Sequence, residues 1–123
     1  MAAERPCPAI FVTGTDTGVG KTLVAAAMAR HFTQKGLKVG VMKPIETGVN
    51  NPDELGSDAV LLRWAANSED DAGLISPYRF SQPLAPCQAA TLDKRQIDTE
   101  EIVKAYRALK EGKDLVLVEG AGG

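Results

Sequence analysis

A glycine-rich segment at residues 14–22, with the sequence GTDTGVGKT, constrains the fold more than any other part of the chain. It follows a short apolar run at residues 9–13 and precedes an alanine-rich stretch that begins at Thr22. A strand, a glycine loop and a helix in this order are typical of phosphate-binding loops, whose backbone N–H groups and helix N-terminus hold phosphate oxygens. We therefore expect an anion site here, with Lys21 reaching the outer phosphates and the Thr22 hydroxyl binding magnesium.

The spacing of this loop differs slightly from the common pattern, which has four residues between its first glycine and its Gly-Lys pair. Here five residues separate Gly14 from Gly20, so the loop is one residue longer. A glycine turn that merely contains Lys-Thr is the alternative. The strand before the loop and the helix after it favour the phosphate-binding interpretation.

Three apolar runs bounded by turn residues predict buried parallel strands at residues 9–13, 37–42 and 115–118. The spacing of the apolar residues between these runs predicts helices at 22–35, 58–64 and 99–110, with loops at 45–56 and 67–86. Alternating strands and helices predict an α/β fold, with an open, mostly parallel sheet and helices on both faces. We expect a single domain over residues 1–123.

Local signals give the first and last of these helices more detail. Val24, Met28 and Phe32 lie four apart and are expected to form the buried face of the first helix. Asp98 and Glu101 resemble a capping box at the start of the last helix.

Composition and charge exclude several classes of protein. The chain has 14 Lys and Arg against 16 Asp and Glu, and no basic run that would predict nucleic-acid binding. Cys7 and Cys87 are far apart and are expected to be free thiols in a reducing compartment. The N-terminal apolar run is too short for a signal peptide or a membrane span, so we expect a cytoplasmic protein without a membrane partner.

The last residues of the sequence, EGAGG, follow a strand pattern and have no element after them. A strand that ends in a glycine loop normally leads into further structure. We therefore expect the N-terminal part of a longer domain, truncated after about half of it; a small domain with a frayed glycine tail is the alternative.

Three chemically active side chains follow or precede predicted elements at one edge of the sheet. Lys43 and Glu119 each end a strand, and Asp58 begins a helix. Ligands of open parallel sheets bind at this edge, and oxygen atoms suit magnesium, so Thr22, Asp58 and Glu119 form a candidate metal site. Alone, Lys43 could be a solvated lysine, Asp58 a simple helix cap, and Glu119 a charge that ends a strand by chance.

Taken together, these motifs resemble those of the dethiobiotin synthetases. The segments that carry the resemblance are FVTGTDTGVGKT, KPIETG, SDA, PYRF with PLAP, and VEGAGG, and they cover nearly the whole chain in order. The resemblance implies an ATP-dependent and Mg²⁺-dependent cyclo-ligase of biotin biosynthesis. In that reaction 7,8-diaminononanoate is carboxylated by CO₂, the carbamate is phosphorylated by ATP, and the product closes to a cyclic urea.

The resemblance also assigns roles to individual residues. Lys43 and Lys21 would be catalytic, Thr47 would contact the diamine, and Thr22, Asp58 and Glu119 would bind magnesium. The residues that would line the nucleotide site are Gly18, Val19, Gly20, Lys21, Thr22, Leu23, Asp58, Glu119, Gly120, Ala121 and Gly122. The full-length protein would be a homodimer, and the 123-residue chain alone would be inactive.

Two other functions stay open on the sequence alone, as does an inert fragment that only resembles an enzyme. One is a related ATP-dependent amide ligase, against which the Lys-Pro-x-x-Thr-Gly segment argues. The other is a nucleotide-switched regulatory ATPase, which commonly has an extra lysine early in the loop, where this chain has Thr15, Asp16 and Thr17.

Overall fold

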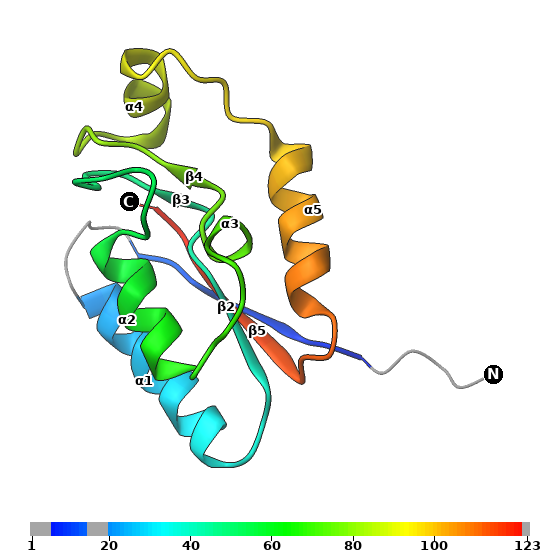
Figure 1. The fold of residues 1–123 in the computed structure, drawn as a ribbon. Helices are drawn as coiled ribbons and strands as arrows, with labels where there is room; N and C mark the ends of the chain where they lie inside the picture. The colour runs from blue at the N-terminus through cyan, green and yellow to red at the C-terminus, as the bar shows by residue number, and fades with distance from the viewer. Residues whose placement is uncertain (1–5, 15–19, 122–123) are drawn as a thin grey trace.

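The chain is described by a computed structural model, which covers residues 6–14 and 20–121 (Figure 1). Strands and helices alternate along it. In chain order they are β1 (Ala9–Val12), α1 (Gly20–Gln34), β2 (Val39–Met42), β3 (Ile45–Glu46), α2 (Ser57–Ala65), α3 (Ala72–Ile75), β4 (Tyr78–Arg79), α4 (Pro86–Leu92), α5 (Thr99–Lys110) and β5 (Leu115–Glu119).

The central sheet has three parallel strands in the order β1, β5, β2. β5 lies in the middle, so Leu117 is paired with both Ile10 of β1 and Val41 of β2. Because parallel neighbours need a crossover connection, α1 joins β1 to β2 and α5 leads into β5. The carboxyl ends of all three strands therefore meet at one edge of the sheet.

Helices cover both faces of this sheet, as the sequence predicts (Figure 1). α1 packs against all three strands and α2 packs against α1 and β2, while α5 lies on the other side against β2 and α3. Gly40 permits the close approach of α5, since a Cβ at this position would lie 3.5 Å from Cγ of Leu109. Within the part of the chain that the structure describes, the α/β prediction is confirmed.

Two details of burial differ from the prediction. Phe11 of β1 is 68% exposed, because among the described residues β1 pairs with β5 alone and is an edge strand. Val24 of α1 is also exposed, and the helix is instead buried through Ala25, Ala26 and Ala29. Met28 and Phe32, predicted on the same face as Val24, are half-buried and pack against the core. The small side chains let α1 lie close to both the sheet and α2, so these alanines are its most completely buried hydrophobic residues.

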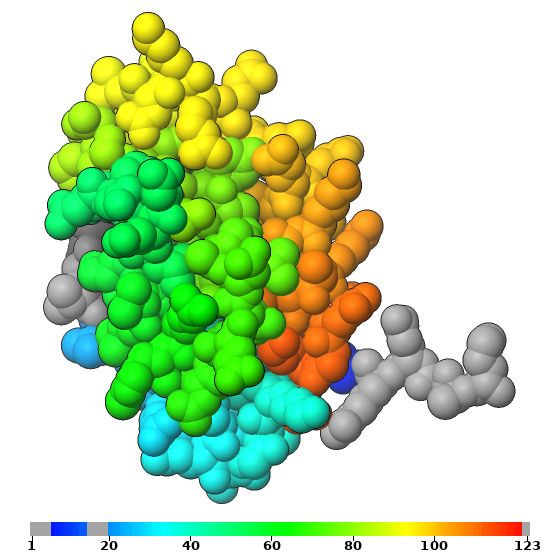
Figure 2. Space-filling model, viewed as in Figure 1, coloured from blue at the N-terminus to red at the C-terminus, as the bar shows by residue number. Residues whose placement is uncertain are grey.

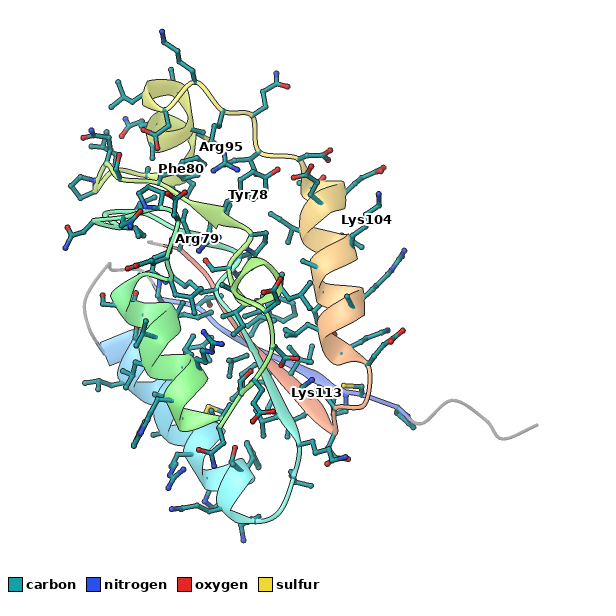
Figure 3. All side chains as sticks on the ribbon, in the orientation of Figure 1. Tyr78, Arg79, Phe80, Arg95, Lys104 and Lys113 are labelled. Carbon is teal, nitrogen blue, oxygen red and sulfur yellow. The ribbon has the colours of Figure 1, made fainter. Side chains whose placement is uncertain are left out.

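The two segments expected to be loops contain regular structure. β3 and β4 form a second parallel pair, with Ile45 opposite Tyr78, and α3 is a short helix in the second segment. The short helix α4, also not predicted, begins at the last residue of that segment. Tyr78 and Phe80 build a second small core with alanines of α4. Figure 3 shows Arg95 beside these two rings, with its guanidinium carbon 5.2 Å and 5.5 Å from their centroids.

The space-filling view in Figure 2 shows α2 and the segments that follow it covering most of β1 and β5 from this side. Cys7 and Cys87 are both free thiols, as expected. Among the described residues, no helix is both long enough and apolar enough to cross a membrane.

Candidate active site at the carboxyl edge of the sheet

The sheet brings the predicted residues to one place. Glu119 ends β5 opposite Val12 of β1, and Lys43 directly follows Met42 at the end of β2. α1 begins at Gly20 at the same edge. This convergence follows from the parallel topology, because each strand delivers its last residue to the same side.

Glu119 is held in the protein interior, with only 1% of its surface exposed. The hydroxyl of Thr22, in the first turn of α1, donates a hydrogen bond of 2.6 Å to its Oε1 atom. Its Oε2 atom is buried and has no hydrogen-bond partner among the described residues. A buried carboxylate oxygen without a partner is costly, so this atom suits a site that is completed by a bound cation.

Lys43 is also buried, at 4% exposure, and it lies between two carboxylates. Its Nζ atom is 3.5 Å from Oε1 of Glu119 and 3.4 Å from Oδ2 of Asp58. It also donates a hydrogen bond of 3.2 Å to the carbonyl of Gly120. These contacts exclude the alternative of a solvated lysine.

Asp58 lies in the first turn of α2, and its side chain is 38% exposed. It makes no side-chain cap there, because the residue at the N-cap position is Gly56. The contact between the Asp58 carboxylate and Lys43 therefore replaces the simple cap as its interaction. Thr22, Lys43, Asp58 and Glu119 thus form one cluster. Asp58 is its most solvent-exposed member, and the other three side chains are buried.

The cluster has the oxygen atoms that a hard divalent cation prefers: two carboxylates and a hydroxyl. No group of three His, Cys, Asp or Glu side chains that could hold a metal occurs in the described ranges. A cation bound by Thr22, Asp58 and Glu119 would therefore need further ligands from water or phosphate. Mg²⁺ is normally bound in this way, with few protein ligands.

The remaining predicted residues lie around this cluster. Lys21 is half-buried in the first turn of α1, whose leading N–H groups lack partners within the helix and can bind phosphate. Leu23 is exposed, Gly120 and Ala121 are half-buried after β5, and Thr47 is half-buried after β3. Gly18, Val19 and Gly122 lie outside the described residues.

The sequence did not single out Glu46, a buried carboxylate beside the cluster. Its Oε2 and Oε1 atoms accept hydrogen bonds from the backbone N–H groups of Asp58 (3.1 Å) and Ala59 (3.2 Å). Burial raises the pKa of Glu46 above its ordinary value of 4.5, and the Asp58 carboxylate adds to this. The two N–H groups and Lys43 act in the opposite direction on the pKa. No local sequence signal predicts that a single acidic residue in a polar segment will bind the start of a helix further along the chain.

Comparison with known proteins finds relatives of this chain that share one name. It is 49% identical over 92% of its length to the ATP-dependent dethiobiotin synthetase BioD of Thermodesulfovibrio yellowstonii, and covers 48% of that protein. The proteins of the same name from Anaeromyxobacter dehalogenans and Methanocaldococcus jannaschii are 47% and 39% identical over 93% of the chain.

The chain spans about half the length of these curated relatives, covering 50% and 52% of the last two. A family described as "AAA domain" matches residues 8–123, which include the phosphate-binding loop, all ten described elements and the cluster around Glu119. By this match over nearly its whole length, the chain belongs to the AAA domain family.

Proposed function

We propose that this chain forms the nucleotide-binding half of an ATP-dependent dethiobiotin synthetase of biotin biosynthesis. Relatives that carry this name match nearly the whole chain. The observation that carries the proposal is the position of Lys43, whose buried ammonium lies between Asp58 and Glu119 beside the first turn of α1. An enzyme that moves a phosphoryl group needs positive charge at such a position.

In this proposal the ATP phosphates bind at the start of α1. The N–H groups from Gly18 to Leu23 would hold phosphate oxygens, and the Lys21 ammonium would reach the outer phosphates. The segment from Glu119 to Gly122 would line the other side of the nucleotide. This assignment is supported by the hydrogen bond between Thr22 and Glu119, which joins the two segments.

We further propose that Thr22, Asp58 and Glu119 hold Mg²⁺ together with the phosphates. When bound there, Mg²⁺ would neutralise charge on the transferring phosphoryl group. The fit is supported by the donor set of two carboxylates and a hydroxyl, and by the unpartnered Oε2 atom of Glu119. Glu119 and Asp58 would also hold the Lys43 ammonium within reach of the reacting groups.

The second substrate would be 7,8-diaminononanoate. One of its amines combines with CO₂ to give a carbamate, an oxygen of the carbamate attacks the γ-phosphorus of ATP, and ADP leaves. The other amine then attacks the carbonyl carbon, phosphate leaves, and the cyclic urea of dethiobiotin forms. Thr47 would contact the diamine, while Lys43 and Lys21 would stabilise the spreading negative charge.

We further propose three properties of the whole protein. The protein would act on small molecules, without a nucleic-acid or membrane partner. It would lie in the cytoplasm, and it would be a homodimer. Because the relatives are about twice as long, the activity is best tested on the longest open reading frame that contains this segment.

The test measures phosphate release from Mg-ATP and bicarbonate, with and without 7,8-diaminononanoate. We expect release that depends on the diamine and that is lost in Lys21→Ala and Lys43→Ala. Lys104→Ala is the matched control, because Lys104 is exposed on α5, away from the cluster (Figure 3). Tight ATP binding without diamine-dependent phosphate release would contradict the proposal and would favour a related ligase or a regulatory ATPase.

A further inference from the structure

Glu46 is a buried acidic residue that the proposed reaction does not use. It is 5% exposed and belongs to β3, while the two N–H groups it binds belong to α2, 12 and 13 positions further along the chain. Burying a carboxylate costs free energy unless it is hydrogen-bonded, so its hydrogen-bond partners indicate what the residue does.

These partners lie at the start of α2. The first N–H groups of a helix have no partner within it, and a side chain at the N-cap position normally accepts one of them. In α2 that position is Gly56, which has no side chain. The Glu46 carboxylate, which belongs to β3, takes the place of the missing cap by accepting two of these N–H groups. Its negative charge also suits the positive end of the helix.

The backbone of Gly56 does not itself require glycine. Its φ of −74° and ψ of 172° are extended values that any residue adopts. A Cβ at this position would instead collide with the Glu46 carboxylate, including Oε1 at 2.7 Å. Gly56 therefore provides the space into which the Glu46 side chain fits.

The geometry points to Glu46 as a positioning residue for Asp58. One of its two hydrogen bonds is to the N–H of Asp58 itself, so Glu46 fixes the residue whose carboxylate lies 3.4 Å from Lys43. Through this bond Glu46 would hold Asp58 in the orientation that binds a cation on the ATP phosphates. The inference rests on the proposed function, in which Asp58 is a ligand of Mg²⁺.

The experiment compares ATP binding by calorimetry with Mg²⁺ and with EDTA, on the full-length protein. The variants are Glu46→Gln, which keeps the shape but offers only one acceptor oxygen, Glu46→Ala, and Gly56→Ala. Asp98→Ala is the matched control, since Asp98 accepts a hydrogen bond from the N–H of Glu100 at the start of α5. A lost cap that matters only for folding would lower the thermal midpoint without changing the ratio of the two affinities.

We expect the gain in ATP affinity from Mg²⁺ to fall by about 10-fold in both Glu46 variants, as is usual when the support of a metal ligand is removed. Binding in EDTA should change by less than about twofold, and Asp98→Ala should keep the wild-type ratio. Gly56→Ala should reduce this gain as Glu46→Ala does. In the double variant of Glu46→Ala and Gly56→Ala the gain should be no smaller than in either single variant, because the added methyl group then meets no carboxylate.

A wild-type ratio in Glu46→Gln and Glu46→Ala would overturn the inference, and so would a wild-type protein whose ATP affinity does not respond to Mg²⁺. Diamine-dependent turnover by the wild-type protein is measured in parallel. Its absence would count against the proposed function alone, because the calorimetry still decides the role of Glu46.

Discussion

Thr22 and Glu119 lie 97 positions apart in the sequence, yet the Thr22 hydroxyl donates a 2.6 Å hydrogen bond to Oε1 of Glu119. The bond joins the first turn of α1 to the end of β5, and both side chains are buried. A carboxylate removed from water depends on the few partners that the protein supplies. The fold around the candidate site is therefore sensitive to each of these partners.

Removing the Thr22 hydroxyl tests this dependence. Thr22→Val keeps the shape of the side chain but leaves Glu119 with one partner fewer. We expect a loss of about 1–3 kcal/mol in the free energy of unfolding, measured by urea denaturation without metal. Thr22→Ser keeps the hydroxyl and should retain most of the stability. A valine variant as stable as the wild type would show that the bond contributes nothing.

Lys43→Met should make folding depend on a divalent cation. The substitution removes the ammonium between Asp58 and Glu119, and breaking a buried pair by removing one partner costs about 3–5 kcal/mol. Mg²⁺ bound at the same carboxylates would restore much of this loss. We expect the rise in thermal midpoint on adding Mg²⁺ to be larger in Lys43→Met than in the wild type.

The control for this comparison is Lys104→Met, a change of the same kind at an exposed position of α5. It should leave the response to Mg²⁺ at the wild-type size. An equal response in Lys43→Met and the wild type would mean that the ammonium and the cation do not share the carboxylates.

Gly40 should tolerate only a small side chain, because α5 covers it. A Cβ there would lie 3.3 Å from Cγ2 of Val116 and 3.4 Å from Cγ of Lys113. Gly40→Val adds two further methyl groups to this space and should cost about 1–3 kcal/mol in urea denaturation. Gly40→Ala should change stability little, because alanine lowers the entropy of the unfolded chain. A valine variant with wild-type stability would contradict the packing of α5 on β2.

The sequence predicts those elements whose signals are local. The bounds 99–110 of α5 agree with the structure, because Asp98 caps its first turn and Gly112 follows it with a φ of 74°. The expected capping box with Glu101 does not form: the Asp98 carboxylate accepts from the N–H of Glu100, and the Glu101 carboxylate accepts a hydrogen bond from the Tyr78 hydroxyl. A tertiary partner has displaced a local one.

Elements defined by distant partners could not be predicted. β3 and β4 have two residues each and exist because they pair with one another, so neither has a pattern of its own. α4 is not predicted, because Pro86 ends the expected loop, although proline also favours the first position of a helix. In the site, strand ends predicted Lys43 and Glu119, whereas Glu46 acts through a helix that only the fold brings to it.

Tyr78→Phe should weaken the attachment of β4 to α5 without changing the candidate site. The Tyr78 hydroxyl donates to Oε2 of Glu101 and accepts from the N–H of Asp98, both at 2.8 Å. Because Glu101 and Asp98 are exposed, water can replace the lost hydroxyl, and the expected loss is only about 1 kcal/mol in urea denaturation. Tyr106→Phe, a change at the other tyrosine of the chain, provides the matched comparison and should cost less.

Affinity for Mg-ATP should be the same in both tyrosine variants and the wild type, because the cluster of Lys43, Asp58 and Glu119 is held by other contacts. Calorimetry on the same samples measures this directly. Weaker binding in Tyr78→Phe alone would mean that the β3–β4 pair transmits the change through Glu46, which lies opposite Arg79 in that pair. The two measurements together separate the stability of this part of the fold from its influence on the candidate site.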